Sequence, residues 1–332
     1  MTRHGFVLTC RCAFTSLLVL GALLGHAAES GRGNMRVGVV HLQSPSTALQ
    51  GINAFWDRLH ELGYKEGENV IIEARWAEGR LDRLPALLAD LVGRNVDVIV
   101  TYGTPAAIAA KRETSTIPIV GISMGEPLRT GLVTSLARPG GNLTGLSVGW
   151  TDRMPGKWLE LLQETVPRLS TVALISNPEN PISQELVKEL QIVAPTRNLK
   201  VLVLEVREPK GLEQTFEQAR RKAQAVLLLP GVAVFASPEQ VTALATKHRL
   251  PAMYYLRDFV DAGGLMAYAP DMVTQWRRGA DYVDKIIKGA KPADLPIEQP
   301  TQYLLVVNLK AARALGLKIP ESILLRTDET IR

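Results

Sequence analysis

Short stretches of β-branched residues alternate with amphipathic helical patterns along most of the chain. The first pair is a strand expected over residues 35–41 and a helix over 48–62, in which Ile52, Phe55 and Leu59 recur at helical spacing on one face. The same order then continues, with strands expected at 70–76, 96–101 and 117–122 and helices at 81–92 and 105–112. Because strands that alternate with helices are typical of parallel sheets covered by helices, the pattern predicts an α/β protein with parallel central sheets.

The second half of the chain repeats this order. Strands are expected at 171–175, 200–206, 225–229 and 251–255, with helices at 182–194, 211–222 and 238–248. Each strand starts about 130 residues after its counterpart in the first half, and this near-constant offset is the signature of an internal repeat. We therefore expect two similar lobes rather than one large sheet.

Glycine-rich segments fall where two such lobes would meet. Residues 138–145 join the two halves, and Gly263-Gly264 close the second half. A helix expected over 271–288 then leads into Lys291-Pro292 and Leu295-Pro296, a third connection. Lobes joined by such hinges can close around a ligand, but two static domains with a fixed interface would show the same periodicity.

Residues 1–28 have the composition of a secretory signal peptide. Arg3 and Arg11 form a basic start, residues 12–24 are apolar apart from two hydroxyl residues, and small residues follow at 25–28. An apolar run of about 13 residues suits a signal peptide and is short for a membrane span, although an uncleaved anchor is the alternative. The expected location is therefore the periplasm.

Removal of this segment changes how the composition is interpreted. The full chain of 332 residues has 38 Lys and Arg against 33 Asp and Glu, a net charge of +5, and two cysteines. Without Arg3, Arg11 and both cysteines the net charge is +3, which gives no reason to expect a nucleic-acid partner. A chain without thiols has no disulfide, no thiolate nucleophile and no Cys-bound zinc. The remaining His41, His60 and His248 are far apart, so neither a metal nor another cofactor is expected.

Catalytic motifs are absent from the sequence. It contains no G-x-S-x-G elbow, no Walker loop and no H-E-x-x-H pair, and the glycines of 140–145 lack the spacing of a dinucleotide-binding loop. We therefore expect a binding protein that is not an enzyme, with no catalytic residues, and an exported hydrolase on the same fold is the alternative.

Several segments spread over the whole chain carry a family resemblance. They are Glu61–Val70, Trp76–Arg80, Gly103–Ala107, Ile117–Val120, Leu136–Gly145, Phe259–Met266 and Ala311–Pro320. Together they resemble the ABC-transporter substrate-binding proteins of the tryptophan/tyrosine-binding-protein-like group. The resemblance covers nearly all of the chain after the signal peptide.

The resemblance implies the type I periplasmic-binding-protein fold, in which two Rossmann-like lobes are joined by a three-segment hinge and close over a ligand. On this interpretation residues 35–145 and 269–296 form lobe 1, and residues 146–268 and 297–332 form lobe 2. The implied function is extracytoplasmic solute binding for an ABC uptake transporter, whose permease lies in the inner membrane with a cytoplasmic ATPase. The implied ligand is a small organic molecule, a carboxylate or an amino-acid-like or aromatic compound, bound by a monomer. A sensor module that signals to a membrane receptor would have the same lobes and is the alternative.

Ligands of open parallel sheets bind beyond the carboxyl ends of the strands, near helix N-termini. Gly103 and Thr104 follow one strand and precede a helix, so free amides there would attract a carboxylate, unless they form only a plain helix cap. Ser44 follows the first strand and allows the same two interpretations. Ser123 and Glu126 follow the fourth strand, where the acid either pairs with a ligand amine or remains a solvated loop residue.

The corresponding positions of the second half are Asn177 and Gly231, each of which follows a strand. Val232 stands where the amino-acid-binding relatives tend to place Asp or Asn. Since a valine cannot hold an ammonium group, this departure argues against a free amino acid as the ligand.

Aromatic and basic candidates follow the next strand. Strand alternation allows only one of Tyr254 and Tyr255 to face the cleft, and Tyr254 is included among the candidates. Arg257 could clamp a carboxylate, and Tyr268 near the hinge could stack on a flat ligand. Trp150, just after the first connection, is a similar candidate. For each residue the alternative is a packing or surface role.

Overall fold

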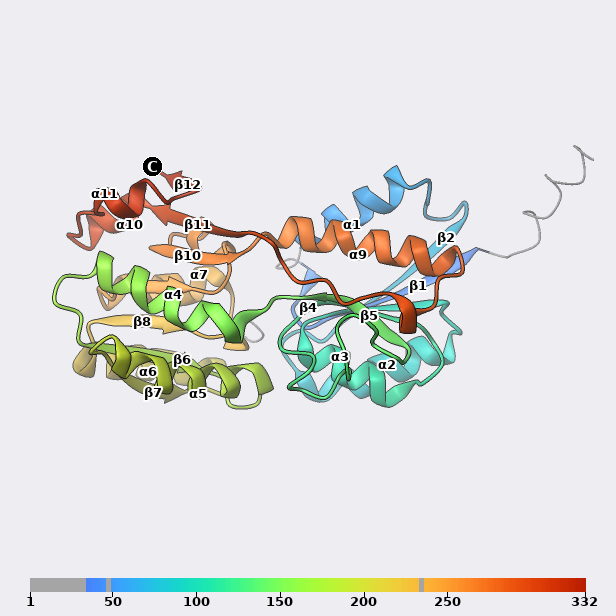
Figure 1. The fold of residues 1–332 in the computed structure, drawn as a ribbon, viewed down its shortest axis with the longest axis horizontal. Coiled ribbons are helices and arrows are strands. Elements are labelled where there is room, and N and C mark those ends of the chain that lie inside the picture. Colours follow the sequence, from blue (N-terminus) through green and yellow to red (C-terminus); the bar gives the residue numbers. More distant parts are fainter. Residues whose placement is uncertain (1–33, 46–48, 233–235) are drawn as a thin grey trace, which may run out of the picture.

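The computed structural model describes residues 34–45, 49–232 and 236–332. The chain forms two α/β lobes that lie side by side along the long axis of the molecule (Figure 1). The signal peptide expected over residues 1–28 lies outside the described residues.

Lobe 1 is built on a five-stranded parallel sheet with the order β2-β1-β3-β4-β5. Its strands are β1 (Met35–His41), β2 (Val70–Trp76), β3 (Val98–Tyr102), β4 (Ile119–Met124) and β5 (Leu143–Ser147). Every neighbouring pair in this sheet is parallel, as the alternation of strands and helices predicts.

Lobe 2 has a seven-stranded sheet with the order β12-β11-β10-β9-β8-β6-β7. Its strands are β6 (Thr171–Ser176), β7 (Lys200–Glu205), β8 (Ala225–Leu228), β9 (Ala252–Tyr254), β10 (Met266–Pro270), β11 (Tyr303–Asn308) and β12 (Glu329–Ile331). The run β7-β6-β8-β9-β10 has the same parallel order as the five strands of lobe 1, which confirms the internal repeat. β11 pairs antiparallel with β10, so the last two strands run opposite to the rest.

Helices cover both faces of the lobe 1 sheet. They are α1 (Leu49–Glu61) and α9 (Met272–Ile287) on one face, and α2 (Leu84–Gly93) and α3 (Thr104–Glu113) on the other. The alternation along β3 explains this arrangement: Val98 and Val100 pack toward α1 and α9, whereas Ile99 packs toward α2 and α3. The remaining helices belong to lobe 2. They are α4 (Trp150–Thr165), α5 (Pro181–Thr196), α6 (Leu212–Lys222), α7 (Pro238–Lys247), α8 (Asp258–Asp261), α10 (Leu309–Ala314) and α11 (Glu321–Leu324).

The chain passes three times between the lobes, as Figure 1 shows. It leaves lobe 1 after β5, returns after β10 into α9, and leaves again before β11. The first two passages lie two residues beyond the limits expected at residues 145 and 268. The first and third passages pair with each other, because Ser147 N donates to the Glu298 carbonyl at 2.8 Å and Glu298 N donates to the Gly145 carbonyl at 3.0 Å. Backbone pairing of this kind joins the segments into one hinge.

The glycine-rich segment 138–145 contains a strand that its composition conceals. β5 begins within it at Leu143 and pairs with β4, although the pattern of glycines predicts only a connection. Gly145 explains why glycine is needed here: its φ is +129°, and a Cβ at this position would lie 2.1 Å from the carbonyl oxygen of Gly121 on β4. Because the two backbones approach this closely, glycine stands where a strand would normally have a larger side chain, and the sequence pattern typical of a strand is lost.

We expect Gly145→Ala to destabilise lobe 1 strongly, because the new Cβ overlaps main-chain atoms that have no room to move. The matched control is Gly67→Ala, since Gly67 also has a positive φ of +82° but has nothing within 4 Å of an added Cβ. The control should cost about 1 kcal/mol from backbone strain alone. Gly145→Ala should cost at least about 2 kcal/mol more, measured from urea unfolding curves. Equal costs for the two variants would contradict the steric account of β5.

Candidate functional site

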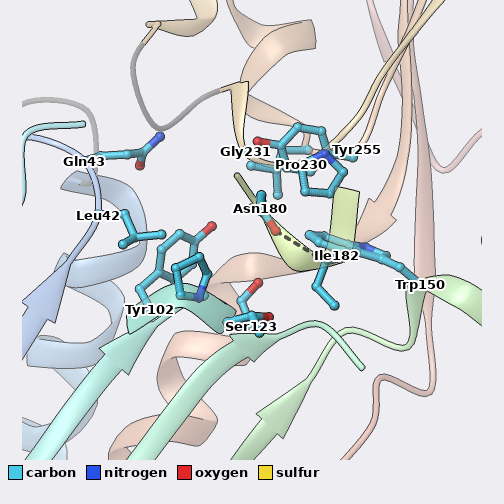
Figure 2. Close-up of a pocket in the computed structure, with 14 residues that line it drawn as sticks. Leu42, Gln43, Tyr102, Ser123, Trp150, Asn180, Ile182, Pro230, Gly231 and Tyr255 are labelled. Carbon is cyan, nitrogen blue, oxygen red and sulfur yellow. Dashed lines mark hydrogen bonds between the residues drawn. The ribbon is translucent and has the colours of Figure 1, made fainter. Parts of the chain in front are cut away.

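A pocket lies between the two lobes, where loops that follow strands of both sheets face each other (Figure 2). It holds about 490 Å³ of empty space, part of it continuous with solvent. Its walls are formed by Leu42, Gln43, Tyr102, Gly103, Thr104, Pro105, Ser123, Trp150, Asn180, Ile182, Pro230, Gly231, Tyr255 and Leu256. We call this the interlobe pocket. Of the residues expected from the sequence, it contains Gly103, Thr104, Ser123 and Gly231, together with Trp150.

The lobe 1 wall is dominated by the N-terminus of α3. Gly103 occupies the N-cap position with φ +81°, so no side chain caps the helix, and Pro105 lies in its first turn. The hydroxyl of Thr104 does not cap α3 as the sequence suggests; it accepts a hydrogen bond from Gly125 N at 2.8 Å and ties α3 to the loop after β4. The first turn of α3 therefore opens into the pocket without a capping side chain.

Tyr102 and Ser123 lie beside this helix terminus (Figure 2). Ser123 adopts φ +56°, an unusual conformation for a residue other than glycine, and its hydroxyl is hydrogen-bonded to Tyr102. Burial of the phenol, with a smaller contribution from the negative charge of Asp258, raises the pKa of Tyr102 well above its ordinary value. Tyr102 is therefore a neutral hydroxyl at the pocket wall at every physiological pH.

The lobe 2 wall is formed by the N-terminus of α5, which unlike that of α3 is capped by a side chain. Asn180 is the N-cap of α5 and its side-chain oxygen accepts from Ile182 N at 3.0 Å. Behind it, the Asn177 amide donates to the carbonyl of Gly231 at 3.2 Å. Asn177 thus supports the wall from behind, and Asn180 lines the pocket in its place. The sequence signal for Asn180 was present, because Asn followed by Pro181 is a typical helix start after a strand.

Two aromatic side chains close the lobe 2 side. Trp150 and Tyr255 meet edge to face, with their ring centroids 5.6 Å apart. The indole nitrogen of Trp150 is buried and has no hydrogen-bond partner among the described residues. Tyr254 points away from the interlobe pocket, stacks on Phe259 at 4.9 Å and lines a different surface depression. Of the two neighbouring tyrosines, Tyr255 and not Tyr254 therefore faces the pocket.

The other expected residues lie outside the interlobe pocket. Ser44 and Glu126 do not contribute to its walls, although each has an interaction of its own. Arg257 is directed to a surface cluster, where its guanidinium donates two 2.7 Å hydrogen bonds to Glu329 and also pairs with Asp261. Tyr268 packs on the Tyr303 ring at the hinge, with centroids 5.7 Å apart.

An aromatic stack that the sequence analysis did not single out supports the lobe 1 wall. The rings of Tyr102 and His41 are stacked with centroids 4.5 Å apart, and the Trp276 ring of α9 lies 5.7 Å from His41. Burial lowers the pKa of the His41 imidazole to about 3, and Nδ1 accepts a hydrogen bond from Gln43 N. His41 is thus a neutral structural residue that positions Tyr102 and Gln43, and no periodicity distinguishes it from an ordinary strand residue.

Charge is distributed unevenly around the pocket. Among the described side chains, none that lines the interlobe pocket is charged at neutral pH. A second crevice shares Gln43 and Tyr102 with it and contains one acid, Asp258, contributed by lobe 2. Within the described part of the chain, no cluster of three or more His, Cys, Asp or Glu could hold a metal ion. The site thus offers hydroxyls, amides and aromatic faces, with a single carboxylate nearby.

The depressed pKa of His41 makes a pH-dependent contribution to stability. Because the folded pKa of about 3 lies below the unfolded value of 6.5, the unfolded state binds a proton first as the pH falls. Between about pH 6 and pH 4 the native protein should therefore lose stability more steeply than His41→Asn, by up to about 1.4 kcal/mol per pH unit. Urea unfolding at several pH values measures this slope. Parallel pH profiles for the two proteins would show that His41 is not held neutral.

The chain matches a family model described as ABC transporter substrate binding protein over residues 36–331. A curated relative, the tyrosine-binding protein of Clostridioides difficile (strain R20291), is 23% identical over 283 residues, which cover 85% of this chain and 81% of that protein. Within the described residues, no helix is both long enough and apolar enough to cross a membrane.

Solved structures show the same fold. The ABC domain from Streptococcus pneumonia in complex with L-Trp has a TM-score of 0.83 and 25% identity, over 90% of this chain and all of that one. A conserved domain protein from Vibrio cholerae O1 biovar eltor has a TM-score of 0.84 and 26% identity with the same coverage. The two lobes therefore have the type I periplasmic-binding-protein-like fold, as the sequence predicts. Since the family match spans nearly the whole chain, this protein belongs to the ABC transporter substrate-binding proteins, a family of extracytoplasmic proteins that bind small-molecule solutes.

Proposed function

We propose that this protein is the periplasmic solute-binding component of an ABC uptake transporter, and that its lobes close over a small organic molecule with a carboxylate and a flat apolar body. The observation that carries this proposal is the interlobe pocket, which is uncharged, aromatic-lined and open to an uncapped helix N-terminus. The closed ligand-bound form is the one presented to an inner-membrane permease.

The carboxylate is assigned to the N-terminus of α3. Backbone N–H groups of the first turn of a helix have no intrahelical acceptor, and the helix dipole favours a negative charge there. In α3 the cap position is a glycine, so no side chain competes with a ligand for these donors. Trp150 lines the same pocket from lobe 2, and its indole N–H, which is buried without a partner among the described residues, supplies a further donor to an acceptor on the ligand.

The apolar body is assigned to the space between the side chains of the two lobes. Leu42 and Pro105 contribute from lobe 1. Ile182, Trp150 and Tyr255 contribute from lobe 2 (Figure 2). Aromatic rings prefer edge-to-face or offset contacts with one another, so an aromatic ligand fits against the Trp150 and Tyr255 pair. The names of the relatives agree with this class, since one is called a tyrosine-binding protein and another was solved with L-Trp.

Closure of the lobes is supported by an ion pair between them. Arg129, in the lobe 1 loop after β4, donates to Glu189 on α5 of lobe 2 at 2.7 Å and also approaches Glu185. These side chains are partly exposed, so the pair contributes only about 0–1 kcal/mol, and the free energy of closure has to come mainly from the ligand. A solute-binding protein of a transporter has to change conformation mainly when ligand is bound, so that the conformation indicates whether the binding site is occupied.

A thermal-shift screen of the purified protein tests the ligand class. The compounds are aromatic carboxylates, aromatic amino acids and dicarboxylates, with simple sugars and amines that lack a carboxylate as the negative set. A ligand at 100 times its dissociation constant stabilises the folded state by about 2.7 kcal/mol, which raises the melting temperature measurably. We expect shifts with aromatic acids, whereas shifts only with sugars or amines would contradict the assignment at α3. Turnover of a bound compound would contradict a function limited to binding.

We expect Trp150→Phe to weaken binding of the best compound from that screen by about 5- to 30-fold, because it removes one hydrogen bond to a ligand acceptor while it preserves an aromatic ring. The unliganded protein should lose about 1–2 kcal/mol of stability from the space that the smaller ring leaves in the core, and it loses no hydrogen bond because the indole N–H has no partner among the described residues. The matched control is Trp56→Phe on α1, a half-buried tryptophan far from the pocket, which should leave affinity unchanged. Calorimetric titration provides both affinities, and equal affinity for Trp150→Phe and the native protein would refute the role of the indole.

A further inference from the structure

Among the residues that the structure describes, Asp258 is the one acid that lines the crevice next to the interlobe pocket. It begins α8 in lobe 2, is partly buried, and lines the crevice opposite His41, Gln43, Tyr102 and Trp276 of lobe 1. Within the described part of the chain, no cationic side chain lies within salt-bridge distance of its carboxylate. Burial raises the pKa of this carboxyl, and the charge of Asp258 in turn affects the phenol of Tyr102.

The charged residues around Asp258 form ion pairs with other partners or are neutral. Arg257, the adjacent residue, directs its guanidinium to Glu329 and Asp261, so its positive charge acts on Asp258 only from a distance, while the negative charges of Asp261 and Glu239 oppose ionisation of Asp258. Asp261, on the same short helix, is paired through Arg257. His41 is neutral because burial lowers its pKa to about 3, so it does not balance the charge either. Since a partly buried carboxylate without a direct ion pair is unfavourable, a carboxylate in this position points to a cation that arrives from outside the chain.

The geometry of the crevice favours an organic cation. Its other walls combine aromatic rings, amides and apolar side chains. Tyr102 and Trp276, whose rings are stacked 5.4 Å apart, line it together with Gln43 and Gln50 and with Met272 and Val273. Aromatic faces attract ammonium groups, and a single carboxylate provides one charge, which matches a protonated amine. A divalent metal would instead require several oxygen ligands around one point, and no such cluster occurs among the described residues.

We propose that Asp258 is the counter-ion for a protonated amine on the ligand, held where the interlobe pocket and the neighbouring crevice meet at Gln43 and Tyr102. This inference rests on the proposed function and specifies its ligand: an aromatic amino acid, with its carboxylate at α3, its ring between the lobes and its ammonium at Asp258. It also accounts for Val232. That residue is fully buried in the lobe 2 core, so an acid there would not face the pocket, and the negative charge comes from a different strand end.

Paired compounds that differ only in the amine provide the test. L-tryptophan is compared with indole-3-propionate and with tryptamine, and L-tyrosine with 3-(4-hydroxyphenyl)propionate, by calorimetric titration of the full chain. The variants are Asp258→Asn and, as a matched control, Asp261→Asn, which neutralises a carboxylate of the same helix that is paired with Arg257.

The native protein should bind each amino acid about 10- to 100-fold more tightly than its analogue without the amine, which corresponds to one charged hydrogen bond. Asp258→Asn should remove this preference and leave the affinity for indole-3-propionate within about threefold, while Asp261→Asn should keep the preference. Equal loss of affinity for both members of a pair in Asp258→Asn, or no preference in the native protein, would overturn the proposal. Binding of tryptamine but not of indole-3-propionate would support Asp258 while refuting the carboxylate site at α3. Binding of none of these compounds would overturn the proposed function and the inference together.

The unliganded protein gives a second readout that does not depend on affinity. Because the pKa of Asp258 is raised in the folded state, its charged form opposes folding at neutral pH, and this opposition disappears as the pH falls below the folded pKa. Asp258→Asn should therefore raise the melting temperature of the unliganded protein at pH 7 by ~1–3 °C. A lower melting temperature for this variant would show that Asp258 has a structural partner and would overturn its assignment as an unpaired counter-ion.

Discussion

The carboxyl ends of the parallel strands determine where this protein can bind anything. In a parallel sheet all strands end at one edge, where the following helices present their N-terminal amides. Both lobes turn this edge toward the gap between them: the pocket residues Gln43, Gly103 and Gly231 follow β1, β3 and β8. Because the same strand order occurs twice, each lobe supplies an equivalent half of the site, and the site is complete only when the lobes meet.

The hinge holds the two lobes in this arrangement through contacts between main-chain atoms. Gly145 lets β5 approach β4 to a distance that no side chain allows, and the first and third passages between the lobes are hydrogen-bonded to each other. These bonds between main chains join the lobes at the hinge. The Arg129–Glu189 pair also links the two lobes, but it is partly exposed and therefore weak. On the proposed function, the ligand supplies most of the free energy that closes the lobes.

The aromatic side chains and the charged groups have different roles within the site. The stack of His41, Tyr102 and Trp276 is neutral and buried, and it fixes the ring of Tyr102 at the pocket wall. The interlobe pocket has donors but no charged side chain, which suits an acidic group at the N-terminus of α3. Asp258 places one negative charge beside this neutral region. An arrangement with one helix terminus and one carboxylate distinguishes ligands by the number and spacing of their own charges.

The sequence by itself determined the fold class, the internal repeat and the strand ends that carry the site, since these follow from local periodicity. Gly103, Thr104, Ser123 and Gly231 were predicted in this way and line the interlobe pocket, because each lies at or shortly after the end of a strand. Only the tertiary structure decided which neighbouring side chains face the pocket. Tyr255 and Asn180 do so in place of Tyr254 and Asn177, because strand twist and helix capping set their directions. Likewise, the pairing of Arg257 with Glu329 and the isolation of Asp258 depend on contacts between segments far apart in the chain, which no local pattern records.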